Sequence, residues 1–352
     1  MAIRPVLVLL AAVALGACSG RQSGTNVPTQ PGAAVGLLGA GSTFVNPFFS
    51  RAFDAYHAVD PTVSINYQSI GSGGGIQQFT AQTVDFGATD VPMNAKELAA
   101  VHGGASAVLQ IPVALAGVAI AYNVPGAPAH LVLSPALLAQ IYLGDVKNWD
   151  DGAIASLNPG AKLPDLPIVV VHRADGSGTT YIFTDYLSAV SAAWKAKVGK
   201  AKIVSWPAPS SVGMKGNEGV AGQVKNTPGA IGYVELAYAL QTGMAYAAMV
   251  NRSGAPIAPS IASVKAAAAS MPDVTPASFS IVNSGAKAAY PLAGYTWALL
   301  YKKYPDAAKQ TALCHLFRWI ETDGQKLATT IDYVDLPAGV SSRAAAALGP
   351  CR

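Results

Sequence analysis

Three short glycine-rich segments combine a permissive backbone with hydroxyl side chains, and this combination suits an anion. They read GAGST at 39–43, GSGGG at 71–75 and GSGTT at 176–180. Each lies where a strand-like stretch gives way to a helical pattern. The first N–H groups of a helix lack intrahelical partners and the helix dipole makes that end positive, so such ends bind anions. The segments therefore predict three helix ends that converge on one tetrahedral anion.

The same hydroxyl groups also fit a structural role. Ser and Thr are common N-caps, because their side-chain oxygens accept hydrogen bonds from the free N–H groups of a first helical turn. Under this interpretation Thr43, Ser72 and Ser177 would cap three unrelated helices. For any one segment taken alone, capping is the more frequent explanation.

Local patterns predict the elements that hold the first two segments. Behind Pro47, the residues Phe49, Phe53 and Tyr56 recur at helical spacing, which predicts a helix after the first segment. The stretch VSINYQSI alternates apolar and polar residues and predicts a strand before the second segment. The helix that follows it is expected to begin near Ile76.

The third segment has the same arrangement, and a further strand is expected near the end of the chain. The apolar run at 168–172 predicts a buried strand, and YIFTDYLSAV predicts the helix after the segment. The aromatic stretch at 295–301 predicts a strand of the core.

Known nucleotide and catalytic motifs do not match these segments. Gly199-Lys200 is followed by Ala201, so the Walker pattern fails, and neither Gly71 nor Gly176 begins a dinucleotide fingerprint. The five His residues are isolated in the sequence and no nucleophile elbow surrounds a Ser. We therefore expect no enzyme, no metal and no cofactor. The competing hypotheses are a secreted phosphatase with a Ser nucleophile, and an adhesin or a receptor for another oxyanion.

The N-terminal residues indicate the compartment. Arg4 precedes an apolar run that ends in Leu15-Gly16-Ala17-Cys18, which predicts a lipoprotein signal at 1–17 with Cys18 lipidated. An ordinary signal peptide cut elsewhere is the alternative. Residues 18–35 lack apolar periodicity and are expected to form a flexible tether. The protein would then be periplasmic or on the cell surface, with a lipid anchor in the membrane.

Composition limits the remaining classes. The 352 residues are long enough for two domains, with 51% hydrophobic and 12% charged residues. The net charge is +4 and the 23 basic residues form no run, which argues against nucleic-acid binding. Cys314 and Cys351 remain as a pair in an oxidising compartment, either joined in a disulfide or as two unpaired thiols.

Several ordered motifs resemble the periplasmic phosphate-binding protein of the high-affinity phosphate ABC transporter. They are GAGSTF, IGSGGGIQQF, TVDFGATDVPMN, IYLGDVKNWDDGAIASLNPG, RADGSGTTYIFTDYL and PGAIGYVE, and they span most of the chain after the tether. The resemblance implies an α/β fold of the two-lobed type II binding-protein class, with two mixed sheets flanked by helices and two hinge crossovers. One lobe is expected at 36–112 plus 291–352, and the other at 113–290.

The resemblance also implies a site, partners and a state of assembly. Phosphate would contact Thr43, Phe44, Ser72 and Asp90 from one lobe and Arg173, Ser177, Gly178 and Thr179 from the other, with Asp175 supporting the arginine. The chain departs from the family pattern at Ser42, where a small residue is usual, and in the three glycines after Ser72. The implied partners are permease and ATPase subunits of an importer, and the part outside the membrane is expected to be monomeric.

Selectivity is expected to depend on Asp90. Phosphate keeps a proton at neutral pH and sulfate keeps none, so a buried carboxylate accepts a hydrogen bond from phosphate alone. The alternative is that Asp90 only shapes the turn before Pro92. For Arg173 the alternative is a surface residue paired with Asp175, against a guanidinium fork that meets two phosphate oxygens.

Overall fold

The computed structural model describes residues 34–351, which form one compact unit. The predicted signal, the predicted lipidation site Cys18 and nearly all of the predicted tether lie outside the described residues. Strand β1 begins at Val35, the last residue assigned to the tether. No helix among the described residues is long and apolar enough to cross a bilayer.

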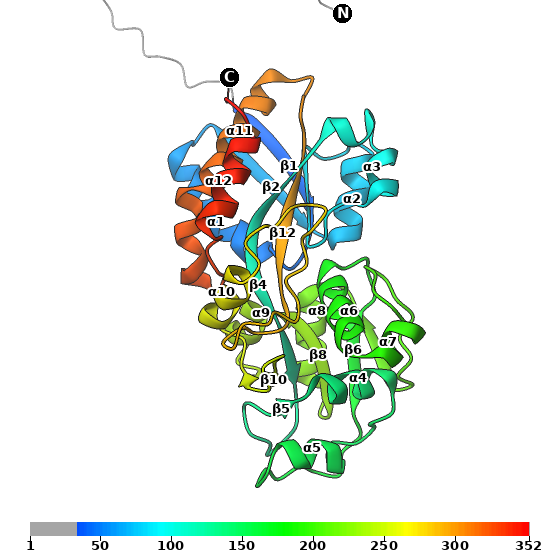
Figure 1. Cartoon of the computed structure of the whole chain (residues 1–352). Coiled ribbons are helices and arrows are strands. Elements are labelled where there is room, and N and C mark those ends of the chain that lie inside the picture. Colours follow the sequence, from blue (N-terminus) through cyan, green and yellow to red (C-terminus); the bar gives the residue numbers. More distant parts are fainter. Residues whose placement is uncertain (1–33, 352) are drawn as a thin grey trace, which may run out of the picture. The chain divides into compact units, whose positions relative to one another are not determined.

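The elements alternate between strands and helices along most of the chain (Figure 1). The first part contains β1 (Val35–Gly41), α1 (Asn46–Val59), β2 (Val63–Ser69), α2 (Ser72–Thr80), β3 (Phe86–Thr89), α3 (Ala95–Ala100), the 3₁₀ helix η1 (Gly104–Ala107) and β4 (Val108–Tyr122). The middle contains β5 (Val132–Leu133), α4 (Pro135–Leu143), α5 (Gly152–Leu157), β6 (Val169–Arg173), α6 (Gly178–Val190), α7 (Ala192–Lys197), β7 (Ser211–Met214), α8 (Gly216–Asn226), β8 (Ala230–Glu235) and α9 (Leu236–Gln241). The last part contains β9 (Ala245–Tyr246), β10 (Ala248–Val250), β11 (Pro256–Ile257), α10 (Ile261–Ala269), β12 (Ala293–Tyr301), α11 (Ala307–Glu321), η2 (Asp323–Ile331) and α12 (Ala338–Ala347).

A mixed sheet runs through the whole unit in the order β2-β1-β3-β12-β4-β8-β6-β7. The pairs β1–β2, β1–β3, β6–β8 and β6–β7 are parallel, whereas β12 and β4 pair antiparallel with their neighbours. Helices flank the strands (Figure 1). This arrangement confirms the predicted α/β class with mixed sheets.

Strand β4 joins the two halves of this sheet. Its residues from Val108 to Gly117 pair with β12, and those from Val118 to Tyr122 pair with β8. We call the half built on β2, β1, β3 and β12 the first lobe, and the half built on β8, β6 and β7 the second lobe. The residue boundaries predicted for the lobes stay a prediction, because β4 runs without a break through the proposed boundary after residue 112.

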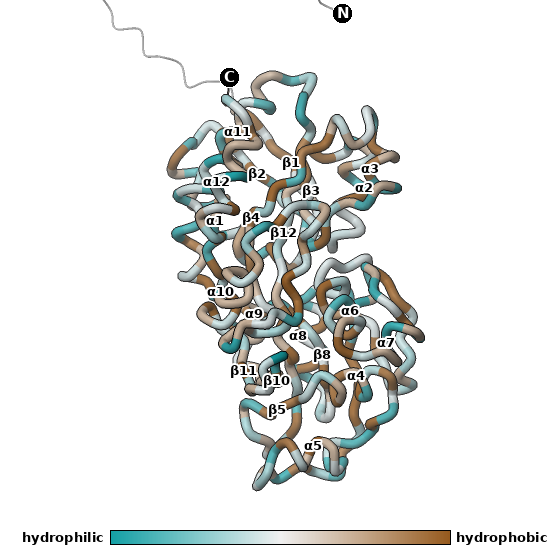
Figure 2. The backbone as a smooth tube through the Cα atoms, viewed as in Figure 1, coloured by the Kyte–Doolittle hydropathy of each residue, from teal (hydrophilic) through white to brown (hydrophobic). Residues whose placement is uncertain are grey.

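Apolar periodicity explains how the helices attach to the sheet. Helix α1 buries Phe48, Phe49, Ala52 and Tyr56 on one face, while Arg51 on the opposite face is exposed. Hydrophilic and hydrophobic stretches alternate along the outer helices (Figure 2). Each large apolar side chain that is fully buried contributes about 1.5–3 kcal/mol, so this face holds the helix and with it the loop before it.

The aromatic stretch near the C-terminus forms the predicted strand. Strand β12 is buried over almost its whole length, and Trp297 lies fully inside the core. Thr296 is also buried there, on a strand whose other residues are mainly apolar. A buried hydroxyl requires a hydrogen-bond partner, which Thr296 finds in the site described below.

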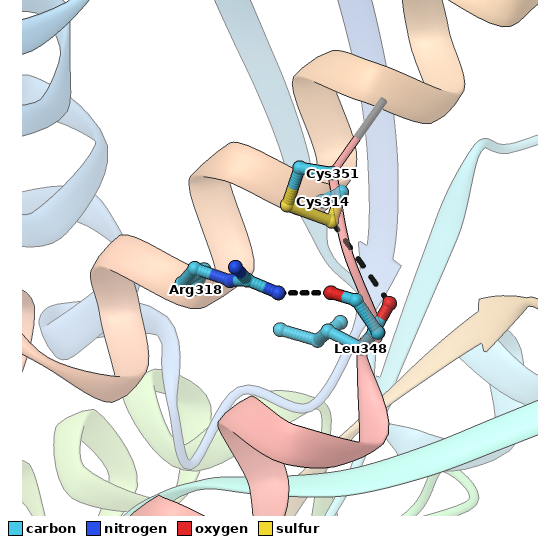
Figure 3. Close-up of a disulfide and its surroundings, with 5 residues drawn as sticks. Cys314, Arg318, Leu348 and Cys351 are labelled. Carbon is cyan, nitrogen blue, oxygen red and sulfur yellow. Dashed lines mark hydrogen bonds between the residues drawn. A yellow bond between two sulfur atoms is a disulfide. The ribbon is translucent and has the colours of Figure 1, made fainter.

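The C-terminal tail is fixed to helix α11. Cys314 on that helix and Cys351 form a disulfide with an S–S distance of 2.01 Å (Figure 3). The Arg318 guanidinium, one turn further along α11, donates to the Gly349 carbonyl (Figure 3). Two separate contacts therefore hold the last residues of the described chain.

Candidate anion-binding site

The three glycine-rich segments meet at the junction of the two lobes. The Gly73 N–H at the start of α2 donates to the Gly176 carbonyl before α6, at 2.7 Å. The segment after β1 reaches the second lobe as well, because the Tyr238 hydroxyl donates to the Thr43 carbonyl at 2.7 Å. The structure thus brings together the segments that the sequence predicts to converge.

Glycine is required where the lobes touch. A Cβ atom on Gly178 would lie 2.4 Å from Oδ2 of Asp90 and 2.6 Å from Oγ of Ser72, both on the first lobe. Gly71 has a φ of +87°, and a Cβ there would lie 2.2 Å from Oδ2 of Asp175. The absence of side chains at these positions lets two backbones approach one small space.

Asp90 places a carboxylate in that space. Its Oδ1 accepts hydrogen bonds from the hydroxyls of Ser42 at 2.5 Å and Thr296 at 2.6 Å. Its Oδ2 lies 3.3 Å from Oγ of Ser72. Burial raises the pKa of Asp90 to about 6, because desolvation outweighs these hydroxyl donors and the charge of Arg173. Two donors occupy Oδ1, whereas Oδ2 accepts only from the Ser72 hydroxyl. Oδ2 lies beside Gly178 of the second lobe and can accept a further hydrogen bond.

Arg173 supplies the opposite charge from the second lobe. Its Nε donates to Oδ1 of Asp175 at 2.7 Å and its Nη2 donates to Oδ2, while only 1% of its side chain is exposed. The Gly216 N–H also donates to Asp175, at 3.1 Å, and holds the carboxylate. Two of the three guanidinium nitrogens are thus fixed, and Nη1 points toward Thr179 at 3.5 Å. The pairing with Asp175 that was expected of a surface arginine is present, but the arginine is buried.

Three buried hydroxyls accept hydrogen bonds without donating one. Thr43 accepts from Asn217, Ser177 accepts from the Thr180 N–H at 3.0 Å, and Thr179 accepts from Asn217 at 3.1 Å. Each is at most 1% exposed. Within residues 34–351 none of these hydroxyls donates to a protein acceptor. A buried hydrogen-bond donor without an acceptor costs free energy of folding. The three hydroxyl hydrogens are therefore suited to a bound ligand with several acceptor oxygens.

Capping explains only part of this pattern. Ser177 is the N-cap of α6 and bonds the Thr180 N–H. Thr43 and Ser72 are not N-caps, because Val45 precedes α1 and Gly71 precedes α2, and neither end has a side-chain cap. The N–H groups of Gly178 and Thr179, in the first turn of α6, have no intrahelical partners.

Two details differ from expectation. Helix α2 begins at Ser72 and not near Ile76, so the glycines lie inside its first turn. Gly75 packs there against the first segment, since a Cβ on it would lie 2.4 Å from Gly41 Cα. The Phe44 N–H, expected to bind the anion, donates to Oγ of Ser42 at 3.0 Å.

Comparisons with known proteins show the family of this chain. A model described as a PBP superfamily domain matches residues 21–312. The phosphate-binding protein PstS of Xylella fastidiosa (strain 9a5c) is 44% identical over 319 residues, which cover 89% of this chain and 85% of the relative. PstS of Pasteurella multocida (strain Pm70) is 43% identical over 307 residues, covering 86% and 87%. The chain belongs to the PstS family.

A solved structure supports the fold of this family member independently. The phosphate-binding protein from Stenotrophomonas maltophilia superimposes with a TM-score of 0.69 at 18% identity, covering 89% of this chain and 94% of that one. At this level of identity the likeness concerns the fold alone.

Sequence reasoning missed a fourth strand-to-helix junction of the PstS fold. Strand β7 ends at Met214, Gly216 has a φ of +70°, and Asn217 stands in the first turn of α8. The stretch MKGNEG has the same strand, glycine and helix order as the other three segments. It carries no hydroxyl residue, and for this reason a search for Gly with Ser or Thr passes over it.

Three further residues escaped the sequence reasoning. Ser42 and Thr296 orient Asp90, and Tyr238 joins the lobes. Thr296 lies more than 200 positions after Asp90, and its apolar neighbours gave no signal of a polar role. Ser42 was noted only as a departure from the family pattern, yet its hydroxyl bonds the key carboxylate.

A buried carboxyl stands behind the first segment. Glu235 at the end of β8 is fully buried, and burial raises its pKa well above the ordinary value. The Tyr333 hydroxyl contacts Oε2 of Glu235 at 3.1 Å and also the carbonyl of Phe44. The single hydroxyl hydrogen of Tyr333 is shared between these two oxygens. The carbonyl of Phe44 is thereby held in place.

Proposed function

We propose that this protein binds inorganic phosphate outside the cytoplasm and delivers it to an ABC importer. The observation that carries the proposal is the set of buried hydroxyls that accept without donating at the lobe junction, where Asp90 supplies a buried carboxylate acceptor. Such a surplus of donors fits a tetrahedral oxyanion, and the acceptor fits one that still carries hydrogen. The PstS relatives bear the name phosphate-binding protein, so this member is a binding protein and not an enzyme.

The contacts follow from the two lobes. From the first lobe the anion is held by Thr43, Ser72, Asp90 and, after a local rearrangement of its amide, Phe44. From the second lobe it is held by Arg173, Ser177, Gly178 and Thr179. Asp175 turns the guanidinium so that Nη1 faces the anion. Because the donors come from both lobes, the anion completes the closed state and its entry requires the lobes to open.

Discrimination against sulfate comes from Oδ2 of Asp90. Ionised Asp90 accepts a hydrogen bond from the protonated oxygen of phosphate, whereas fully ionised sulfate brings a bare oxygen against a carboxylate oxygen. A site with such an unmatched polar group rejects a near-isosteric ligand by as much as roughly 10⁴–10⁵ in favourable cases. Shape alone does not separate two tetrahedral anions of similar size.

The remaining assignments concern location and partners. Lipidation of Cys18 after removal of residues 1–17 would tether the lobes to a membrane through the segment 18–35. Permease and ATPase subunits of a phosphate importer are the proposed partners. The proposed lobes comprise residues 36–112 plus 291–352 and residues 113–290. The part of the protein outside the membrane would bind the importer as a monomer.

Titration of phosphate-stripped protein tests the function. We expect phosphate and arsenate to bind and sulfate not to bind, as measured by calorimetry at neutral pH. Asp90→Asn should narrow the gap between phosphate and sulfate, because an amide donates as well as accepts. Equal affinity of the unmodified protein for phosphate and sulfate would refute the role of Asp90, and the absence of phosphate binding would refute the function.

A further inference from the structure

Asn217 occupies a position between the two threonines of the site, one from each lobe. Its Nδ2 lies 2.8 Å from Oγ1 of Thr43 and 3.1 Å from Oγ1 of Thr179. Its backbone N–H donates to Oγ1 of Thr43 as well, at 3.1 Å. The side chain is fully buried. A single amide therefore contacts one hydroxyl from each lobe.

The orientation of this amide is fixed by its other end. Oδ1 of Asn217 lies 3.0 Å from the backbone N–H of Glu235. A backbone N–H only donates, so the atom that faces it must be the oxygen. The two hydrogens of Nδ2 are then directed at the two threonine oxygens, and no flipped arrangement satisfies Glu235.

These bonds determine where the threonine hydrogens point. A hydroxyl oxygen has two acceptor positions and one hydrogen. On Thr43 both acceptor positions are filled by Asn217, and on Thr179 they face Asn217 and Nη1 of Arg173. Each hydroxyl hydrogen is left to point away from these donors.

We propose that Asn217 is a positioning residue that fixes the hydroxyls of Thr43 and Thr179 as hydrogen donors toward the bound anion. This inference rests on the proposed function and adds a determinant that does not itself touch the ligand. Asn217 belongs to the second lobe and Thr43 to the first, so the donor set is complete only when the lobes close. The anion would then meet hydroxyl donors whose direction is fixed before it binds, with the carboxylate of Asp90 as the acceptor.

Substitution of Asn217 by aspartate tests the direction of the hydrogens. The carboxylate side chain has nearly the same shape as the amide and keeps an oxygen for the Glu235 N–H. It replaces the Nδ2 donor by an acceptor, however, so the threonine hydrogens turn toward it. We expect calorimetry on the full chain to show a phosphate Kd raised by roughly 100-fold for Asn217→Asp and by roughly 10-fold for Asn217→Ala.

Measuring Asn217→Asp in a protein that lacks the Thr43 hydroxyl distinguishes a change of hydrogen direction from the effect of the added charge. Repulsion between an aspartate and phosphate would raise the Kd equally with or without the Thr43 hydroxyl. Hydroxyl reorientation predicts that the loss from Asn217→Asp shrinks by at least about 5-fold in a Thr43→Val background. If Asn217→Asp raised the phosphate Kd by the same factor in the unmodified protein and in the Thr43→Val variant, the proposal would be overturned.

Two controls keep the result interpretable. Tyr238→Phe removes a different hydrogen bond between the lobes, the one from the Tyr238 hydroxyl to the Thr43 carbonyl. It leaves the hydroxyls of Thr43 and Thr179 in place. It should raise the Kd by about 10-fold or less and should show no coupling to Thr43→Val; coupling as large as that of Asn217 would refute the special role of Asn217. The unmodified protein decides the function separately, since failure to bind phosphate refutes both ideas, whereas binding with additive variant losses refutes only this one.

Discussion

At the scale of single residues, the site holds a charged acceptor in a place where charge is unfavourable. Asp90 is 3% exposed and burial raises its pKa to about 6 from an ordinary value of 3.8. The three hydroxyls around it and the nearby arginine offset only part of the desolvation. The selectivity proposed for a protonated anion would therefore come at the expense of the stability of the ligand-free protein.

The pH dependence of Asp90 can be measured through stability. The folded state favours protonated Asp90, so this contribution to stability is full below about pH 3.8 and is lost as the pH rises through about 6. Asp90→Asn stays neutral at every pH. We expect the Tm of the phosphate-free variant, relative to the unmodified protein, to increase between pH 4 and pH 7.

Glu321 provides a matched control for this prediction. It is another buried carboxyl whose pKa burial raises well above the ordinary value, on α11 and outside the site. Glu321→Gln should also raise the Tm at neutral pH but leave phosphate affinity unchanged. A Tm difference for Asp90→Asn that stays constant from pH 4 to pH 7 would contradict the assigned role of its charge.

At the scale of elements, the site depends on where strands end and helices begin. Four junctions place their backbones within contact of one another, and glycines such as Gly71 and Gly178 make this approach sterically acceptable. The helices themselves are held by apolar faces packed on the sheet. The positions of the polar groups thus follow from packing that involves no polar group.

The disulfide is an element-scale device that is separate from the site. Cys314 and Cys351 are 37 positions apart, and a crosslink of that loop length stabilises a protein by about 3–4 kcal/mol through the unfolded chain. We expect Cys351→Ser combined with Cys314→Ser to lower the free energy of unfolding by up to about that amount in denaturant titrations. Phosphate affinity should stay unchanged, because neither residue contacts the lobe junction.

The effect on phosphate affinity distinguishes a disulfide that only stabilises the C-terminal tail from one that also supports the anion site. Treatment of the unmodified protein with a reductant should reproduce the loss seen for the double variant and should add nothing to that variant. A phosphate Kd that rises together with the loss of stability would show that the tail supports the site, contrary to this expectation.

At the scale of the whole molecule, closure is held by a few contacts between the lobes. Gly73 bonds Gly176 through their backbones, and Nζ of Lys202 pairs with the carboxylate of Glu97. The side chains of this ion pair are 16% and 21% exposed, so solvent screens it only in part. The pair joins α3 of the first lobe to the segment between α7 and β7 of the second, so it should slow reopening.

Release of phosphate therefore tests the ion pair. Lys202→Met should raise the rate of phosphate release in stopped-flow experiments by up to about 5-fold, the range expected for a pair worth about 0.2–1 kcal/mol, with little effect on the association rate. Lys326→Met is the matched control, since Lys326 pairs with Asp323 inside one segment and joins no lobes. Equal release rates for both variants would show that the Lys202 pair does not hold closure.

The amino-acid sequence by itself determined the local chemistry of this protein. The order of strand, glycine and helix predicts anion-binding helix ends, and Arg173 ends a strand where such a site lies, with Asp175 two positions after it. These features are readable because they depend on neighbours in the chain. The start of α2 was misplaced for the opposite reason, since glycines enter a helix there only because Gly75 fits against the first segment.

Only the tertiary structure decided which groups complete the site. Asn217, Thr296 and Tyr238 act on residues that lie between 38 and 206 positions away, and none of them belongs to one of the three glycine-rich segments with Ser or Thr. The direction of a hydroxyl hydrogen depends on every donor around its oxygen, and those donors come from separate strands and helices. For this reason the sequence predicts which residues meet the anion, whereas the fold sets which of them are placed to donate and which one to accept.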